Sequence, residues 1–289
     1  MSFILFSDSG CNLPQRKLRE LDIRVIRFTY EMDGETILCP ESPDGFDGQT
    51  FYQRLKNGAE TKTSLLNVDD FLSAFRPWVE SGQDVLYVGL SSGVSGTYQS
   101  SVLAARELMA EFPERHIQCV DSKGAGLGTG ILTCRAADYR SEGLDVNQAA
   151  ERLRQDAENL CEFFTVDDLM FLKRTGRVSG ITATLGSMLQ IKPMLRGDEE
   201  GKIVVCGKIR GRKRAIADLA EKYAKRVVDA GAQRVAISHG NCLEEARLLA
   251  EKVKEIARPK ELILSIHEPL TGTHVGPGML ALFFFGEGR

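Results

Sequence analysis

Hydroxyl-bearing residues cluster in one glycine-containing stretch of the N-terminal half. Residues 90–98 read Leu-Ser-Ser-Gly-Val-Ser-Gly-Thr-Tyr and lie between an apolar run with the character of a strand and a segment of helical spacing. A helix that begins in such a turn presents unpaired backbone N–H groups, and its dipole favours an anion. The hydroxyls of Ser95 and Thr97 would add hydrogen bonds to that anion. The alternative interpretation is that Ser95 or Thr97 only caps the helix.

A second hydroxyl pair, Thr63 and Ser64, lies in a predicted loop just before another helix. If the two helix starts converge at the ends of neighbouring strands, both pairs face one site. An ordinary polar turn is the alternative. The glycine pattern of residues 124–128 resembles GxGxG, but close helix packing explains it equally well, and neither the spacing of a P-loop nor that of a GxSxG nucleophile elbow is found.

One histidine, His274, lies in a glycine-punctuated segment, residues 271–278, which we predict to be a rigid loop. A histidine there could donate to an anion or to a serine, since its protonation is easily tuned near neutral pH. A Ser-His-acid triad of a serine hydrolase acting on acyl esters can be drawn from Ser95 and His274, but no acid is clearly placed to orient the histidine. A small-phosphate or nucleotide binder using the same helix start is a third hypothesis. No group of residues has metal-ligand spacing, so we expect no metal.

Two basic clusters stand out. Residues 173–177, with Arg174, come at the end of a short predicted helix, where cations are ordinarily favourable. Residues 208–214, with Arg210 and Arg212, come at the start of a long one, where positive charge costs stability. The second cluster is either a solvated face or a site where a phosphate or an acidic partner docks.

Short apolar runs alternate with longer segments of helical period, which predicts an α/β protein with a largely parallel sheet. A charged helical segment, residues 145–160, is followed by a change of composition. We therefore predict two domains, residues 1–160 with a Rossmann-like parallel sheet and residues 161–289 with a mixed sheet. The predicted strands are residues 3–6, 23–30, 36–38, 84–90, 117–120, 191–195, 203–205, 234–238, 262–266 and 280–285. The predicted helices are residues 13–21, 49–55, 68–79, 98–111, 124–139, 145–160, 166–172, 212–228 and 243–256, and residues 178–189 are expected to be buried.

The composition narrows the function classes. The 289 residues are 43% hydrophobic and 27% charged, the balance of a soluble globular protein. With 37 Lys and Arg against 40 Asp and Glu, the net charge of −3 disfavours general nucleic-acid binding. Seven scattered cysteines without CxxC pairs fit reduced thiols in a cytoplasm. The apolar N-terminal run is too short for a membrane span, so we expect a cytoplasmic protein without an integral membrane segment.

Taken together, the ordered motifs resemble the DegV family of bacterial fatty-acid-binding proteins over nearly the whole chain. The motifs that carry the resemblance are Asp8-Ser9, Thr63-Ser64, the stretch Ser91-Ser92-Gly93-Val94-Ser95-Gly96-Thr97-Tyr98-Gln99-Ser100, Asp168-Leu169 to Arg177, Ile191-Lys192-Pro193 and Gly272-Thr273-His274-Val275-Gly276-Pro277-Gly278.

The resemblance implies a two-domain protein with a long-chain fatty acid, of the palmitate, stearate or oleate type, between and within the domains, and no other cofactor. It implies that Thr63, Ser95, the Gly96 N–H and His274 bind the carboxylate. A supporting polar network of Ser64, Ser92 and Thr97 belongs to the same motifs. The tail would lie in the second domain, and we expect its apolar residues to supply the lining, namely Phe163, Phe164, Leu185, Met188, Leu189 and Met194.

The resemblance also implies a partner. Arg174 matches the family's arginine that is associated with docking to a fatty acid kinase, and Arg210 and Arg212 are candidates for the same surface. In that relationship the protein presents its fatty acid to the ATP-binding kinase subunit, which forms an acyl phosphate; the chain itself is not an enzyme, and any membrane contact is transient. One motif departs from the family: Leu65-Leu66-Asn67 follows Thr63-Ser64 where Gln-Pro-Ser is common, which bears on the entrance of the pocket.

Overall fold

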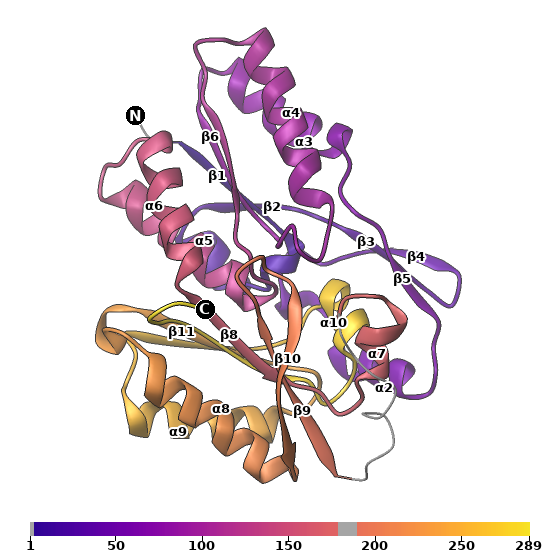
Figure 1. The fold of residues 1–289 in the computed structure, drawn as a ribbon. Coiled ribbons are helices and arrows are strands. Elements are labelled where there is room, and N and C mark those ends of the chain that lie inside the picture. The colour runs from indigo at the N-terminus through magenta and orange to yellow at the C-terminus, as the bar shows by residue number, and fades with distance from the viewer. Residues whose placement is uncertain (1–2, 179–189) are drawn as a thin grey trace.

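The computed structural model describes residues 3–178 and 190–289 (Figure 1). It is an α/β protein with one parallel four-stranded sheet and one mixed six-stranded sheet, so the predicted fold class is confirmed. A small antiparallel sheet of three strands extends from the side of the first sheet (Figure 1). The strands of the parallel sheet lie before residue 122, and those of the six-stranded sheet begin at Leu160.

The parallel sheet has the order β2-β1-β6-β7. Its strands are β1 (Ile4–Asp8), β2 (Ile23–Ile26), β6 (Val85–Gly89) and β7 (Ile117–Asp121). In β1 and β6, Phe6 and Tyr87 belong to the apolar cluster on one face, whereas Leu5 and Leu86 belong to the cluster on the other. This alternation follows from the two-residue period of a strand. Chain order reverses between β1 and β6, and a crevice at such a point, at the carboxyl ends of the strands, is where open α/β sheets bind ligands.

Helices cover both faces of this sheet. One face packs against α3 (Val68–Glu80) and α4 (Thr97–Glu111), and the other against α5 (Leu127–Ser141) and α6 (Val146–Glu158). Helix α5 is buried over most of its length because it also contacts the second sheet, including β8, β11 and β13. Helix α5 therefore lies between the two sheets (Figure 1).

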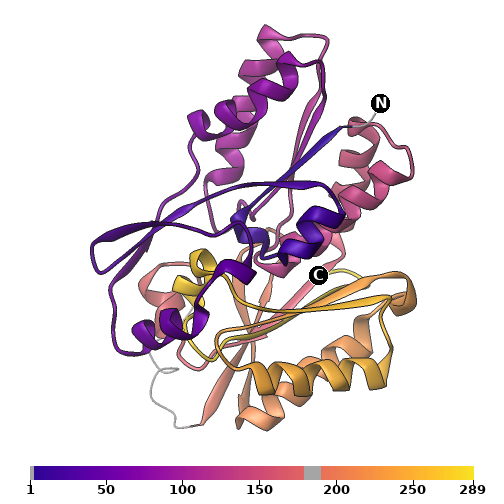
Figure 2. The same cartoon turned by 180° about the vertical axis from the view of Figure 1, so that it is seen from behind.

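The six-stranded sheet has the order β10-β9-β8-β13-β11-β12, and only its β11 and β12 pair is parallel among the described strands. The strands are β8 (Leu160–Thr165), β9 (Ile191–Gly197), β10 (Ile203–Arg210), β11 (Arg234–His239), β12 (Glu261–Ile266) and β13 (Leu280–Phe285). Helices α8 (Arg212–Arg226) and α9 (Leu243–Ile256) cover its outer face through a third apolar cluster (Figure 2).

The remaining elements surround the junction of the two large sheets. They are the three-stranded sheet of β3 (Thr29–Met32), β4 (Glu35–Leu38) and β5 (Thr61–Thr63), the helices α1 (Gln15–Glu20), α2 (Gly48–Lys56), α7 (Met170–Arg174) and α10 (Pro269–Val275), and the short turns η1 (Ser9–Cys11), η2 (Pro43–Gly45) and η4 (Ala230–Ala232). Strands β3 and β4 form a hairpin, with Asp33 and Gly34 at positive φ in its turn.

Several predicted element boundaries were wrong. The expected helix 145–160 ends at Glu158, and the apolar run that follows is strand β8, which the sequence analysis missed. The expected helix 166–172 is replaced by α7, which begins only at Met170. The expected strand 23–30 is divided into β2 and β3, which belong to different sheets. Of the segment 178–189 that we expected to be buried, residues 179–189 lie outside the described part.

Candidate functional site

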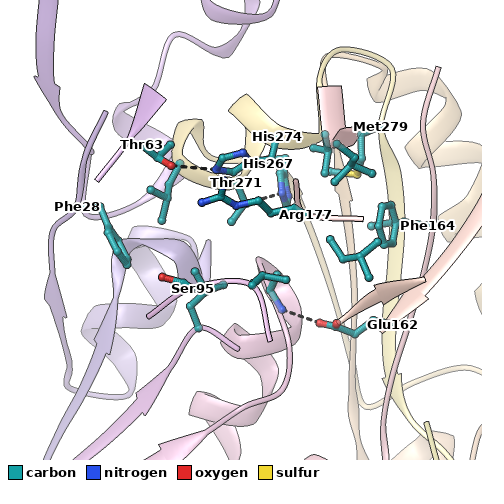
Figure 3. Close-up of a pocket in the computed structure, with 18 of the residues that line it drawn as sticks. Phe28, Thr63, Ser95, Glu162, Phe164, Arg177, His267, Thr271, His274 and Met279 are labelled. Atoms are coloured by element: carbon teal, nitrogen blue, oxygen red, sulfur yellow. Dashed lines mark hydrogen bonds between the residues drawn. The ribbon is translucent and has the colours of Figure 1, made fainter. Parts of the chain in front are cut away.

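A cavity of about 410 Å³ lies where the parallel sheet, the six-stranded sheet and α10 meet (Figure 3). This volume is in the range of pockets that enclose small ligands. Most of its lining is apolar and comes from both halves of the chain, including Phe28, Leu90, Phe164, Val275, Ala281 and Phe283. Nine polar side chains also line it, several of them grouped around His274 (Figure 3), so the cavity suits an apolar molecule that carries a polar group.

The structure brings Thr63, Ser95, Gly96 and His274 to this one cavity. Thr63 Oγ1 and His274 Nε2 share a hydrogen bond of 3.0 Å (Figure 3). We predicted a loop at Thr63, but this residue is the last one of strand β5, where it pairs with Tyr30. The short three-stranded sheet therefore fixes the backbone of this hydroxyl.

His274 also differs from its predicted setting, because residues 269–275 form helix α10 and not a loop. Pro269 occupies the start of the helix, and the Glu268 carboxylate accepts from the amides of Leu270 (2.5 Å) and Thr271 (2.9 Å). Gly272 looks like a helix breaker in the sequence, but a Cβ there would lie 2.7 Å from the Tyr52 hydroxyl. The glycine serves close packing inside a helix, and this explains the wrong prediction.

His274 is held as a neutral imidazole at pH 7. Burial, together with the nearby positive charge of Arg177, lowers its pKa to about 4. Its Nδ1 atom is buried and has no hydrogen-bond partner among the described residues. Because Nε2 is already bonded to Thr63, a ligand that alters the hydrogen bonding of the Thr63 hydroxyl also alters that of the imidazole.

Ser95 is both a helix-start residue and a lining residue of the cavity. Its Oγ accepts from the Thr97 amide (3.3 Å) and donates to Thr97 Oγ1 (3.0 Å). Gly96 is the N-cap of α4 at φ −74°, and no acceptor for its N–H is found in residues 3–178 and 190–289. The capping role and the lining role of Ser95 therefore coexist, and an unpaired backbone donor lies next to it.

Asp8 orients the stretch that carries Ser95. Its carboxylate, buried at the end of β1, accepts from the Tyr87 hydroxyl (2.6 Å) and from the amides of Leu90 (3.1 Å) and Gly10 (2.9 Å). Burial raises the pKa of Asp8 to about 6. These bonds tie the ends of β1 and β6 together, which determines where residues 91–96 leave the sheet.

The supporting residues make different contacts. The Ser64 hydroxyl bonds to Thr29, at 2.5 Å from its Oγ1 and 3.1 Å from its carbonyl oxygen, and the Ser92 hydroxyl donates to Asp121 Oδ2 at 2.5 Å. Both residues line the cavity although their hydroxyls are engaged beside it. Thr97 is fully buried, and its Oγ1 accepts from the amide of Leu66 (3.2 Å).

The leucine pair that departs from the family motif is divided between two environments. Leu65 lines the cavity and is 52% exposed, so it lies at an opening to solvent. Leu66 is buried in the core of the first half of the chain. Leu65 is therefore the member of the pair that can affect entry to the cavity.

The expected tail-lining residues are only partly found at the cavity. Phe164 lines it, but Phe163 and Met194 belong to the apolar cluster on the opposite face of the six-stranded sheet, because neighbouring strand residues alternate between faces. The other candidates, Leu185, Met188 and Leu189, lie outside the described residues.

Four polar lining residues escaped the sequence analysis: Glu162, Arg177, His267 and Thr271. Arg177 adds a cation near His274. His267 shares hydrogen bonds with Thr271 Oγ1 (2.6 Å) and Ser238 Oγ (3.0 Å), and burial lowers its pKa to about 3. A charged residue inside the buried run 160–165 was the available signal for Glu162.

The arginines of the basic clusters have different surroundings. Arg174 is exposed in the last turn of α7 and lies over the ring of Phe171, 4.8 Å from its centroid. Arg210 is exposed at the end of β10. Arg212 bonds Glu245 at 2.6 Å and lies 3.7 Å from Asp167, so its charge is largely satisfied within the chain. Of the three arginines proposed for docking, Arg174 and Arg210 are therefore the accessible ones.

The buried carboxyl group of Glu162 should make the free energy of unfolding depend on pH. Burial raises its pKa from 4.5 to about 7, against the lowering effects of Arg289 and the Ala125 amide. A carboxyl with a raised pKa in the folded state stabilises the fold below its unfolded pKa, and this contribution is lost as the pH rises toward the folded value. The free energy of unfolding of the wild type minus that of Glu162→Gln should therefore fall between about pH 4.5 and 7, by at most about 1.4 kcal/mol per pH unit. Denaturant titrations at several pH values measure this difference, and a constant or rising value would contradict the burial argument.

Within residues 3–178 and 190–289 no group of His, Cys, Asp and Glu is arranged to hold a metal ion. In the same part of the chain no helix has the length and apolar character needed to cross a membrane.

Comparisons with known proteins agree with this architecture. The chain matches the model of the family described as "Uncharacterised protein, DegV family" over residues 2–287. It is 35% identical to a DegV domain-containing protein of Clostridium perfringens over 289 residues, covering 99% of this chain and 98% of the relative. It is also similar to the solved structures of a DegV family protein from Thermus thermophilus, described by its fatty acid binding (29% identity, TM-score 0.85, 99% and 100% coverage), and of DegV from Bacillus subtilis, described as a fatty acid binding protein (27% identity, TM-score 0.83, 99% and 100% coverage).

Proposed function

The chain belongs to the DegV family, and from this membership and the cavity we propose that it binds a long-chain fatty acid. The carboxylate is received by Thr63, Ser95 and the Gly96 N–H, with His274 behind Thr63, and the acyl tail lies along the apolar wall. The observation that carries the proposal is the convergence of these donors, from β5, the start of α4 and α10, on a single and mostly apolar cavity.

The energetics favour such a ligand. About 15 methylenes leaving water gain on the order of 12 kcal/mol, an upper bound before the entropy of binding is subtracted. A carboxylate taken out of water is costly unless several donors receive it, and two hydroxyls with a helix-start amide meet that need. The neutral His274 can hold the Thr63 hydroxyl in place, and Arg177 adds a favourable positive charge near the head group.

Lipid extraction of the purified protein tests this proposal. We expect organic extracts analysed by mass spectrometry to contain about one long-chain fatty acid per chain, or the delipidated protein to take one up on incubation. Failure to detect a stoichiometric amphiphile in either experiment would contradict the proposal. Denatured protein carried through the same incubation is the control for nonspecific adsorption.

The proposal assigns no catalysis to the chain itself. A serine hydrolase needs its nucleophile bonded to the base, yet Ser95 donates to Thr97 and His274 bonds to Thr63. The unpartnered Nδ1 of His274 also has no acid to orient it among the described residues. A fluorophosphonate probe should leave Ser95 unlabelled, and labelling of Ser95 together with turnover of a p-nitrophenyl ester would favour the hydrolase instead.

We further propose that the bound fatty acid is presented to a kinase subunit that forms the acyl phosphate. Arg174 is exposed on α7, a helix that contacts α10, so a partner at Arg174 would lie near the element that carries His274. Arg174→Glu should leave fatty-acid binding in place and lower kinase-dependent acyl phosphate formation by at least about tenfold, since reversing a charge at an interface opposes the partner's complementary charge. Arg210→Glu is the matched charge reversal at the other exposed cluster. Full activity of Arg174→Glu would exclude its docking role.

A further inference from the structure

Glu162 is a carboxylate in an otherwise apolar part of the cavity wall. It lies on β8 with Phe164 two residues further along the same strand, and its residue is only 8% exposed. Figure 3 shows it on the side of Phe164, apart from Thr63 and His274, with its carboxylate directed toward the backbone of the α5 start. It is therefore a second polar position in the cavity, separate from the donors that we assign to the head group.

The backbone around Glu162 is shaped to hold this carboxylate. A Cβ on Gly124 would lie 2.7 Å from Oε1, one on Gly128 would lie 1.9 Å from it, and one on Gly197 would lie 3.1 Å from Oε2. The GxGxG pattern of residues 124–128 thus makes room for a side chain 34 residues or more away in sequence. The carboxylate is held in one place with little freedom to turn away.

Its hydrogen-bonding capacity is only partly used. Oε1 accepts from the Ala125 amide at 2.9 Å. The nearest cation, Arg289, comes only to 3.7 Å from Oε2, and the Arg289 guanidinium donates to the carbonyl oxygens of Ala157, Lys123 and Asp198. No protein group donates to Oε2 within residues 3–178 and 190–289, so this oxygen has lone pairs free for a donor on a ligand.

We propose that Glu162 pairs with a hydroxyl group on the chain of the ligand, so that the cavity prefers a hydroxylated long-chain fatty acid to the unsubstituted acid of the same length. This inference rests on the proposed fatty-acid binding. A saturated tail beside Glu162 would leave Oε2 without a donor, whereas a chain hydroxyl would supply a charge-assisted hydrogen bond.

The surroundings of Glu162 favour a hydroxyl over other polar groups. The positive charge of Arg289 opposes an ammonium group on the ligand, and the carboxylate of Glu162 opposes a second acid. A ketone accepts hydrogen bonds but does not donate them, so it cannot satisfy the ionised form of Glu162. A hydroxyl donates to the ionised form and accepts from the protonated one, and so pairs with both.

The test compares the affinities of stearic acid and of hydroxystearic acids that carry the hydroxyl at different positions, such as 3, 10 and 12. We expect at least one regioisomer to bind the delipidated wild type about tenfold more tightly than stearic acid. Glu162→Leu should abolish that preference and bind stearic acid at least as tightly as the wild type does. Glu162→Gln, which keeps an acceptor of nearly the same shape, should retain part of the preference.

Two results would overturn the inference. One is that every hydroxystearic acid binds the wild type no more tightly than stearic acid, a result that needs no variant to fold. The other is a hydroxyl preference that persists in Glu162→Leu. If neither stearic acid nor any hydroxystearic acid binds the wild type, the proposed function itself is wrong, so the two failures are distinguishable.

Discussion

The double variant Thr63→Ala/Ser95→Ala should bind palmitic acid at least about 100-fold more weakly than the wild type, with its fold intact. In the complex each hydroxyl is expected to donate to the ligand carboxylate, Ser95 in exchange for its bond to Thr97 Oγ1, and a hydrogen bond to a charged group contributes about 1.5–3 kcal/mol. Losing two of them costs about 3 kcal/mol or more, which corresponds to this change in affinity. Isothermal titration of delipidated protein with palmitate measures the affinity directly.

Ser64→Ala is the matched control for this experiment. Ser64 is adjacent to Thr63 and lines the same cavity, but its hydroxyl bonds to Thr29. We expect it to change the affinity by less than about threefold. Equal affinity of the double variant and the wild type would show that the carboxylate binds elsewhere. An equal loss in Ser64→Ala would show that the effect reflects the general polarity of the region.

Ala281→Phe should shorten the longest fatty acid that the protein accommodates and weaken stearate binding by at least about 100-fold. Ala281 is a buried residue of β13 that lines the cavity, so a phenyl group there would occupy space assigned to the tail. Wild-type affinity should rise with chain length by up to about 0.8 kcal/mol per methylene, and the variant should lose this rise at a shorter chain. Excluding four methylenes would account for about 3 kcal/mol, or more than 100-fold.

A graded substitution controls for damage to the fold. Ala281→Val adds less volume, so its limit of chain length should lie between those of the wild type and Ala281→Phe. Octanoate is the control ligand, since a short tail should be affected much less. Circular dichroism and the melting temperature of each variant detect overpacking, which typically costs 1–3 kcal/mol. An unchanged chain-length profile in Ala281→Phe would show that the tail does not pass this residue.

Local patterns in the sequence predicted most of the fold. Alternation and short apolar runs identified strands such as β6 and β13, and the predicted helix 68–79 is found as α3, where Asn67 forms a capping box with Asp70. Strand β8 was missed because its apolar run follows a helix almost directly: Leu160 was read as the end of that helix, and residues 161–165 were assigned to no element. The split of β2 from β3 depends on their pairing with different sheets, which is a tertiary effect that no local pattern contains.

The sequence predicted those residues of the candidate site that belong to a recognisable motif. Thr63, Ser95, Gly96 and His274 come from three motifs that the fold brings to one cavity. Glu162 stands out as a charged residue within the run 160–165, but its place in the cavity wall depends on the contact between β8 and the start of α5, which no local pattern contains.

A glycine that allows close packing inside a helix is also hard to distinguish from a loop glycine in the sequence. Gly272 lies inside a helix and allows close approach of the Tyr52 hydroxyl, so it resembles a loop residue until that neighbour is known. This ambiguity produced the predicted loop at residues 271–278, where the structure has α10.

A crystal structure of the protein with palmitic acid is the decisive test of whether the cavity binds a fatty acid through Thr63 and Ser95. We expect one fatty acid in the cavity, its carboxylate oxygens within about 3 Å of Thr63 Oγ1 and Ser95 Oγ, and its tail running past Ala281. A carboxylate bound away from both hydroxyls, or a palmitate on the surface with the cavity unfilled, would contradict it.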